Sequence, residues 1–223
     1  YDTFSALEDP GFWQDAYMKF YRAWFVGDRW RQYFQGLVTT LEVTIIALII
    51  GVVLGVLVAV IRTAHDQQRP GHKNMVLGVI NGLMRVYITV IRGTSLMVQM
   101  LIMGFVIFAS SRNHTMVGAL ALGINSGAYV AEIIRGGLMA LDSGQMEAGR
   151  SLGLSYFDTM RFIVVPQAFK AILPSLGNEF VTLLKDTSLI SVVAGREIVY
   201  FTQAIVAKTY EAMYPYLITA VMY

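Results

Sequence analysis

The sequence predicts an all-α integral membrane protein with about five transmembrane helices. Hydrophobic residues fill 56% of its 223 positions and charged residues only 14%, and the mean hydropathy is +0.56. A soluble domain of this length is less apolar and more charged. The apolar residues also lie in long stretches. The first, 36–61, makes a helix of about 39 Å at ~1.5 Å per residue, enough to cross a bilayer.

The composition and the motifs argue against chemistry carried out by this chain. Cysteine is absent, so there is no disulfide framework, thiolate metal site or cysteine nucleophile. The chain also lacks the Gly-x4-Gly-Lys-Ser/Thr phosphate loop and the His-Glu-x-x-His zinc motif. We therefore expect no enzyme activity, no catalytic residue, no metal site and no cofactor in this chain. It begins without an initiating methionine and its last apolar run is short, so we expect both ends to continue in a longer protein.

Residues 1–36 differ from the rest of the chain. They contain all three tryptophans, five acidic residues and four basic residues. Helical spacing places on one face the aromatic residues Trp13, Tyr17, Phe20 and Trp24. Aromatic amphipathic helices favour the membrane interface, and packing against the rest of the protein is an equally open alternative. We therefore expect an extracytoplasmic or interfacial N-terminal segment, followed by a transmembrane domain at 37–223.

The first span carries a close-packing signal and ends in a basic loop. Gly51 and Gly55 form a small-xxx-small pair that allows another helix to approach closely. The loop at 62–73 begins with Arg62 and holds three Arg or Lys residues and two histidines. Cytoplasmic loops are enriched in positive charge, so this loop is placed in the cytoplasm and the N-terminus outside.

Residues 75–109 are too long for one straight span, and Arg92 and a second arginine interrupt them. If this stretch crossed the membrane twice, the later segment 142–166, with its arginines, would lie outside the cell. We therefore expect one crossing. Residues 75–92 then run partly along the cytoplasmic interface, the chain bends at Arg92, and 95–109 crosses to an outer loop.

The next span, 116–141, returns to the cytoplasm and carries polar residues at depths where they are costly. Asn125 falls near the midplane, and Tyr129 shares its face at i+4. Polar side chains at this depth face protein or a wet cavity and are candidates for a substrate path. A hydrogen bond between helices is the alternative for Asn125. Further along, Glu132 and Arg135 can form a structural ion pair near the inner boundary.

A polar segment broken by glycine follows at 142–166. Asp142 or Ser143 can cap a short helix, and Gly153 can end it with a positive φ. Ser155 can then begin a second helix by accepting a hydrogen bond from the first turn. The sequence therefore predicts two short helices that meet at the glycine at a fixed angle.

The outward span, 166–190, contains the strongest candidate for a substrate site. Pro174 removes a backbone hydrogen bond from this helix. A charged pair beside a proline break is a feature of transporter sites at mid-depth. The polar residues after the break are Asn178, Glu179, Thr182 and Lys185. A structural intramembrane ion pair is the alternative interpretation.

The end of the chain alternates between mixed and apolar character. Residues 191–212 are expected as an outer loop or short surface helices. Tyr214-Pro215-Tyr216 then opens a last span with aromatic residues at the interface. Five crossings follow, with the N-terminus outside and the C-terminus in the cytoplasm.

The segment 142–166 resembles the EAA signature of permease subunits of ATP-binding-cassette (ABC) importers. That signature reads Glu-Ala-Ala, three residues, Gly, nine residues and Ile-x-Leu-Pro. At this spacing the chain keeps Glu147, Ala148, Gly153, Ile163 and Pro166, and it departs from the signature at Gly149 and Val165. Runs at 91–99, 128–137 and 176–180 are similar to the polar amino acid branch of that family.

The resemblance implies a type I ABC importer permease in the bacterial inner membrane, and residues 142–166 are called the coupling segment below. In that family the segment holds the cytoplasmic coupling helix that docks on an ATPase. The residues implied in coupling are Glu147, Ala148, Gly149, Gly153, Ser155 and Pro166. The implied partners are a second permease subunit, two cytoplasmic ATPase subunits that bind ATP and magnesium, and an extracytoplasmic solute-binding protein that delivers a polar amino acid.

An autonomous ion-coupled transporter or channel is the alternative function. Glu179 and Lys185 are its candidate ion or proton site. We disfavour it because it leaves the coupling segment without a role. An ATPase that co-purifies with the chain distinguishes the two functions.

Overall fold

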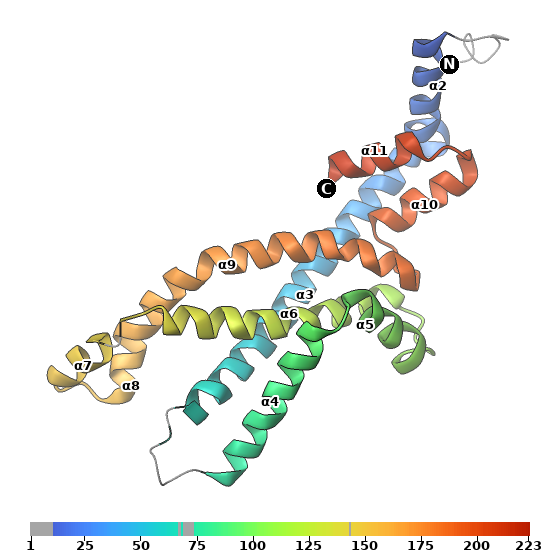
Figure 1. The fold of residues 1–223 in the computed structure, drawn as a ribbon. Helices are drawn as coiled ribbons and strands as arrows, with labels where there is room; N and C mark the ends of the chain where they lie inside the picture. The colour runs from blue at the N-terminus through green and yellow to red at the C-terminus, as the bar shows by residue number, and fades with distance from the viewer. Residues whose placement is uncertain (1–10, 67, 69–73, 143) are drawn as a thin grey trace. The chain divides into compact units, whose positions relative to one another are not determined.

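The computed structural model describes residues 11–66, 68, 74–142 and 144–223, and these ranges contain helices and no strand (Figure 1). The α-helices are α2 (Phe12–Trp24), α3 (Arg29–Asp66), α4 (Met75–Gly93), α5 (Leu96–Ile102), α6 (His114–Met139), α7 (Gly144–Ser151), α8 (Tyr156–Thr159), α9 (Val165–Asp186), α10 (Ile198–Thr209) and α11 (Met213–Met222). Short 3-10 or π turns are η1 (Val26–Asp28), η2 (Met103–Ile107), η3 (Met160–Val164) and η4 (Thr187–Val193). The predicted all-α class is confirmed for these ranges. Ser143 and most of the basic loop, with Arg69 and Lys73, lie outside the described residues.

Three helices in the described ranges are long and apolar enough to cross a membrane, namely α3 with η1, α4 and α6. A fourth candidate is a bent pair made of Tyr156–Val193 and Ile198–Thr209. Leu96–Ile107 and Met213–Met222 are apolar but shorter. The predicted bend after Arg92 is present, because Thr94 is extended between α4 and α5. The structure differs from the expected crossing, since the part of 75–109 that is long enough to span is α4 and not the segment after the bend.

The chain divides into two compact units. The terminal unit comprises Tyr1–Thr44, Met100–Ala119 and Leu184–Tyr223, and the central unit comprises Ile45–Gln99 and Leu120–Leu183. Helices α3, α5, α6 and α9 contribute residues to both.

In the terminal unit, α10 and α11 pack with the beginning of α3 and with α2. Its core contains the fully buried Tyr33, Ile198 and Ile205. At Gly36 the helices touch closely, because an added Cβ lies 2.6 Å from the Cα of Ile198. Of the two expectations for 191–212, an outer loop or short surface helices, α10 is a short helix, but its Ile198 and Ile205 are buried in the core and not at the surface.

Glu197 has a structural role that the sequence did not reveal. Its side chain is fully buried and caps α10 by accepting hydrogen bonds from the backbone N–H groups of Val199 and Tyr200, each at 2.8 Å. The Tyr223 hydroxyl donates to the same carboxylate at 3.1 Å. Such a set of donors satisfies a carboxylate that is removed from solvent.

Helix α2 packs on α10 and α11, and of the four residues of its aromatic stripe only Trp24 packs against the core of the unit. Met18 and Ala23 are buried, whereas Trp13 is 81% exposed and Tyr17 and Phe20 are exposed as well. Outside the membrane-spanning helices, Lys19 pairs with Asp15 at 2.8 Å, and this contact raises the pKa of Lys19. The helix therefore packs on the protein and also presents an aromatic surface.

The α2 helix is joined to α3 through aromatic contacts and a sharp turn. Trp24 stacks on Tyr33 with ring centroids 5.6 Å apart. Gly27 and Asp28, in the turn between the helices, both have positive φ. Helix α3 begins at Arg29, upstream of the expected start at 36.

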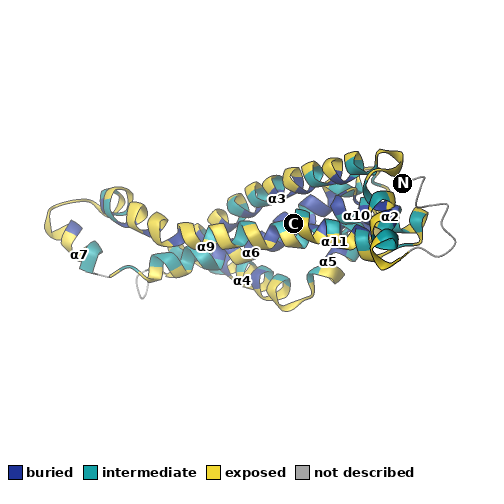
Figure 2. Ribbon diagram, turned by 90° about the horizontal axis from the view of Figure 1, so that it is seen from above, coloured by how far each residue is buried: buried dark blue, intermediate teal, exposed yellow. Residues whose placement is uncertain are grey.

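In the central unit, α3 and α6 pack along glycines, as predicted for Gly51 and Gly55. A Cβ added to Gly51 lies 2.7 Å from the Ser126 Oγ, and one added to Gly55 lies 2.5 Å from a Val130 methyl. From the other side, Gly123 of α6 contacts Ile50 in the same way. Most of α6 between residues 121 and 131 is buried, whereas α9 is largely exposed (Figure 2).

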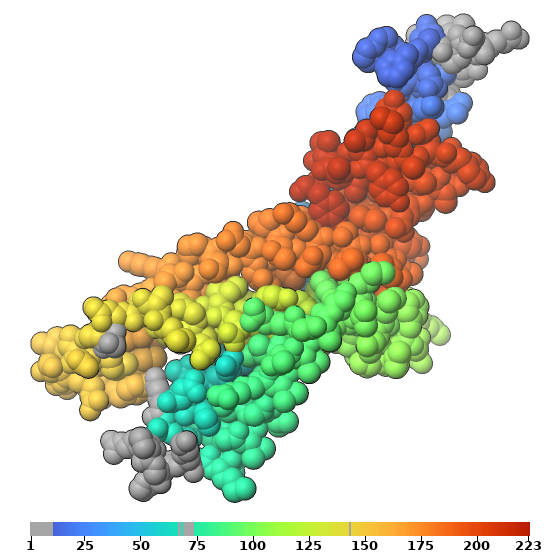
Figure 3. Space-filling view, viewed as in Figure 1, coloured from blue at the N-terminus to red at the C-terminus, as the bar shows by residue number. Residues whose placement is uncertain are grey.

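Helix α4 joins this unit through a narrow face. Ile88 is buried against Val58 and Ala128, and the Tyr87 hydroxyl donates to the Ile124 carbonyl oxygen at 2.5 Å. The opposite side of α4 is exposed along its length, with the apolar side chains of Val76, Val79, Leu83, Val86 and Val90 (Figure 3). A helix that exposes so many apolar side chains needs an apolar surrounding.

Candidate translocation path and coupling segment

The candidate path lies in the central unit, where polar side chains of α6 meet those of α9 and of the bend after α4. Asn125 and Ser126 of α6 are both buried. The Asn125 amide donates to the Gln99 side-chain oxygen at 2.9 Å, and the Ser126 hydroxyl donates to Glu179 Oε1 at 2.7 Å. Two adjacent α6 residues thus hold two polar partners that are distant in sequence.

Gln99 fixes the bend between α4 and α5. Its Nε2 donates to the Ile91 carbonyl oxygen at 2.8 Å and to the Thr94 hydroxyl at 2.7 Å. These contacts satisfy backbone groups that the break in the helix frees. The bend and Asn125 are therefore parts of one hydrogen-bond network.

Arg92 and Tyr129 form a second contact between the bend and α6. The Arg92 guanidinium lies 5.1 Å from the Tyr129 ring centroid, a cation–π distance. Both side chains are exposed, so each remains accessible to a ligand.

The other predicted path residues lie along α9. Asn178 and Thr182 are exposed, and the Thr182 hydroxyl donates to the Asn178 carbonyl oxygen at 2.9 Å. Lys185 is also exposed and belongs to the terminal unit, whereas Glu179 belongs to the central unit.

Sequence reasoning missed three residues of this network, namely Arg92, Gln99 and Ser126. Arg92 and Gln99 fall in the run 91–99 that resembles amino acid permeases, which was the available signal. Ser126 carried no such signal, because a serine beside a glycine is common in apolar helices.

An ion pair between α3 and α6 corrects one prediction. Arg62 was expected in the loop and Glu132 was expected to pair with Arg135. In the structure, α3 continues to Asp66, and Arg62 donates to the Glu132 carboxylate of α6. The pair links the ends of two packed helices.

In the coupling segment, α7 has the predicted start and end. Asp142 Oδ1 accepts from the Gly144 N–H at 2.9 Å. At the other end, the N–H groups of Gly153 and Leu154 bond to the carbonyls of Arg150 and Gly149 at 3.0 and 3.1 Å. Gly153 has φ +82°, so this is a Schellman ending.

The helix after Gly153 begins as predicted but does not end as predicted. Ser155 Oγ accepts from the Asp158 N–H at 3.2 Å and caps α8. The helix then continues through η3 into α9, so it is one long helix and not a second short one. The π turn η3, in which the Val165 N–H bonds to the Met160 carbonyl, precedes Pro166. A proline ring clashes with the carbonyl four residues earlier in a regular helix, and the wider turn relieves this clash.

Gly149, where the chain departs from the EAA signature, is buried against Thr159. A Cβ there lies 2.5 Å from Thr159 Cγ2. The glycine therefore lets α7 pack directly on α8. Gln167 of α9 also donates to Gln145 of α7 at 3.1 Å.

The outer side of the coupling segment is an exposed surface of mixed character. Its exposed residues include Glu147, Ala148, Leu152, Tyr156 and Phe157, and the exposed fraction of Leu152 is 79%. Apolar side chains exposed together on a polar segment mark an interaction surface. Among the described residues, no cluster of acidic or histidine side chains could hold a metal ion.

Residues 72–223 match the family described as "Binding-protein-dependent transport system inner membrane component". A putative glutamine transport system permease of Rickettsia conorii is 36% identical over 192 residues, 85% of this chain and 83% of that protein. A probable glutamine ABC transporter permease of Bacillus subtilis is 33% identical over 202 residues, 88% and 87% of the two chains. The crystal structure of an amino acid ABC transporter with histidines superposes with a TM-score of 0.76 and 39% identity, covering 86% of each chain. The chain therefore belongs to the inner-membrane components of binding-protein-dependent transport systems, and it is an ABC importer permease.

Proposed function

We propose that this permease carries a polar amino acid of the glutamine type, received from a solute-binding protein, and that partner ATPase subunits drive the transport. The observation that carries the proposal is the connection of α7 to the path. Gly153 and Ser155 fix α7 to a helix that runs without interruption to Glu179. Movement of α7 therefore displaces a carboxylate that contacts α6.

The polar network suits a zwitterionic substrate with an uncharged side chain. Arg92 can bind a carboxylate, and Glu179 can bind an ammonium group. The amides of Asn125 and Gln99 have both donors and acceptors for a side-chain amide. Names of the relatives from Rickettsia and Bacillus support glutamine. The proposed path residues are Asn125, Tyr129, Asn178, Glu179, Thr182 and Lys185, together with Arg92 and Gln99.

The proposed coupling surface consists of Glu147, Ala148, Gly149, Gly153, Ser155 and Pro166. It docks in the cytoplasm on one of two ATPase subunits, which bind ATP and magnesium. A second permease subunit, identical or related, completes the path. In this orientation the N-terminus is outside, the C-terminus is cytoplasmic, and the aromatic stripe of α2 lies at the outer interface before the domain at 37–223.

The test is transport by the complete reconstituted complex with a Gly153→Val variant. Valine at φ +82° is strained by roughly 1–2 kcal/mol, whereas a Cβ added there meets no atom within 4 Å apart from its chain neighbours, so the substitution acts mainly through the backbone. We expect normal insertion and loss of ATP-driven glutamine uptake. Gly177→Val, at another glycine with no neighbour within 4 Å and with ordinary φ, is the matched control for the loss of a glycine. Ion-driven uptake by the Gly153→Val chain without any ATPase would establish the autonomous transporter instead.

A further inference from the structure

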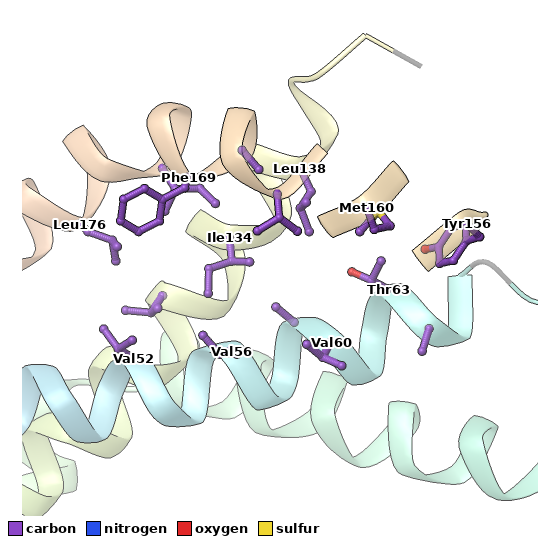
Figure 4. Close-up of a pocket in the computed structure, with 16 residues that line it drawn as sticks. Val52, Val56, Val60, Thr63, Ile134, Leu138, Tyr156, Met160, Phe169 and Leu176 are labelled. Atoms are coloured by element: carbon purple, nitrogen blue, oxygen red, sulfur yellow. The ribbon is translucent and has the colours of Figure 1, made fainter. Parts of the chain in front are cut away.

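A long apolar groove lies in the central unit between α3, α6 and the helix formed by α8, η3 and α9 (Figure 4). Its volume is about 490 Å³. Of its 16 lining residues, only Thr63 and Tyr156 carry a polar side-chain group. Both lie at the end next to the coupling segment, and Val52 and Leu176 lie at the opposite, apolar end (Figure 4).

The groove is elongated. Its lining on α3 extends from Val52 to Ala64, which is about 18 Å along a helix at ~1.5 Å per residue. A long apolar groove with hydroxyls at one end only has the shape and the polarity of one lipid chain below its headgroup.

The capacity of the groove matches the same occupant. An apolar protein cavity of about 150 Å³ takes up benzene, with six carbons, so 490 Å³ has room for on the order of 20 carbons. That is enough for one phospholipid acyl chain. The groove also lies among candidate membrane spans, because α3 and α6 are long and apolar enough to cross and Tyr156–Val193 belongs to the bent candidate.

We propose that this groove binds one acyl chain of a membrane phospholipid. The hydroxyls of Thr63 and Tyr156 mark the end nearer the headgroup. The proposed orientation of the coupling segment places this end in the cytoplasmic leaflet. Binding of the acyl chain does not depend on that orientation.

The bound chain acts as a wedge that positions the coupling helix. Tyr156 and Met160 line the groove, and Thr159, between them on the same helix, packs against Gly149 of α7. Without a filler, the apolar walls lose their van der Waals contacts and close on one another. The position of α7 therefore depends on occupancy of the groove.

The test is photolabelling of the complete transporter in liposomes that contain phosphatidylethanolamine with a diazirine on one acyl chain. We expect adducts on α3 and α9 at groove residues such as Val56 and Phe169, located by mass spectrometry. Val56→Trp fills the groove and should abolish these adducts. Val53→Trp is the matched control, because Val53 lies on the same helix, outside the groove, with an exposed fraction of 54% against 43% for Val56.

Equal labelling of Val56→Trp and Val53→Trp would overturn the proposal, since it would show only annular lipid. A disulfide between two copies that each carry Val56→Cys would also overturn it, because a second permease would then occupy the groove. The chain has no native cysteine to confuse this result. Photolabelling requires neither uptake nor ATP hydrolysis, so its failure is distinguishable from failure of the proposed function.

Discussion

Gly149 and Gly153, in the coupling segment, are constrained for different physical reasons. Gly153 needs its positive φ and has open space around it. Gly149 has ordinary helical geometry and no space, because Thr159 fills the position of a Cβ. The two sites therefore respond to different compensating changes.

We expect Gly149→Ala to weaken the contact of α7 with α8 by about 1–3 kcal/mol, the usual cost of overpacking. Thr159→Ala removes the two atoms nearest the added methyl and should recover part of that cost in the double variant. A double-mutant cycle on thermal stability and on ATPase co-purification measures this coupling. Additive single effects would show that the two residues do not interact.

Glu179→Gln tests the path at its carboxylate. Glutamine retains an acceptor for the Ser126 hydroxyl and removes the charge, so assembly should persist while the maximal uptake rate falls. The measurement is substrate uptake by the reconstituted complex. Glu42→Gln, at an exposed glutamate of α3, is the matched control. Unchanged uptake kinetics in Glu179→Gln would show that the carboxylate has only a structural role.

The sequence predicts residue roles well where the partner is close in the chain. Gly153 ends a helix and Ser155 begins one through neighbouring backbone groups, so local chemistry was sufficient. The partner of Arg62 is 70 positions away, and no local signal identifies it. For the same reason, the burial of Glu197 and the contact of Gln99 with Asn125 required the structure.

Among the elements, α3 and α6 are held together by glycine contacts and by the Arg62–Glu132 pair. The two side chains are 12% and 30% exposed. Breaking a fully buried pair costs about 3–5 kcal/mol, and partial exposure lowers this, so we expect Arg62→Met to destabilise by about 1–3 kcal/mol. Thermal unfolding in detergent provides the measurement. Arg62→Met with Glu132→Met should regain stability, because no unpaired charge remains; a further loss would contradict this account.

Helix α2 offers a test that separates its two faces. Met18→Asp places a charge in the contact with α10 and α11 and should release α2, so trypsin should cleave faster at Lys19 and Arg22. Trp13→Ala removes an exposed side chain and should leave the cleavage rate unchanged. Equal rates for both variants and the unaltered chain would mean that the Met18 contact does not hold α2.

For the whole molecule, orientation in the membrane is testable because engineered cysteines are unique in this chain. We expect Leu152→Cys, in the coupling segment, to react with a membrane-impermeant thiol reagent only from the cytoplasmic side. Arg112→Cys, in the turn before α6, should react only from outside. Labelling of Leu152→Cys from outside in intact cells would reverse the proposed topology.

The arrangement of crossings shows what hydropathy alone can predict. Composition identified the apolar stretches and the break after Arg92, because charge and glycine are visible in the sequence. It did not show which side of that break is long enough to span, or that α10 continues a bent pair. Those features depend on where helices end and on what they pack against.

The position of the tryptophans, one of which is Trp24 stacked on Tyr33, has a spectroscopic consequence. All three tryptophans of the chain, Trp13, Trp24 and Trp30, belong to the terminal unit. Tryptophan emission of this chain, excited where tyrosine does not absorb, therefore originates from α2 and the first turns of α3. A shift of that emission on adding substrate or partner reports a change in the terminal unit, whereas the coupling segment has no tryptophan and contributes nothing to it.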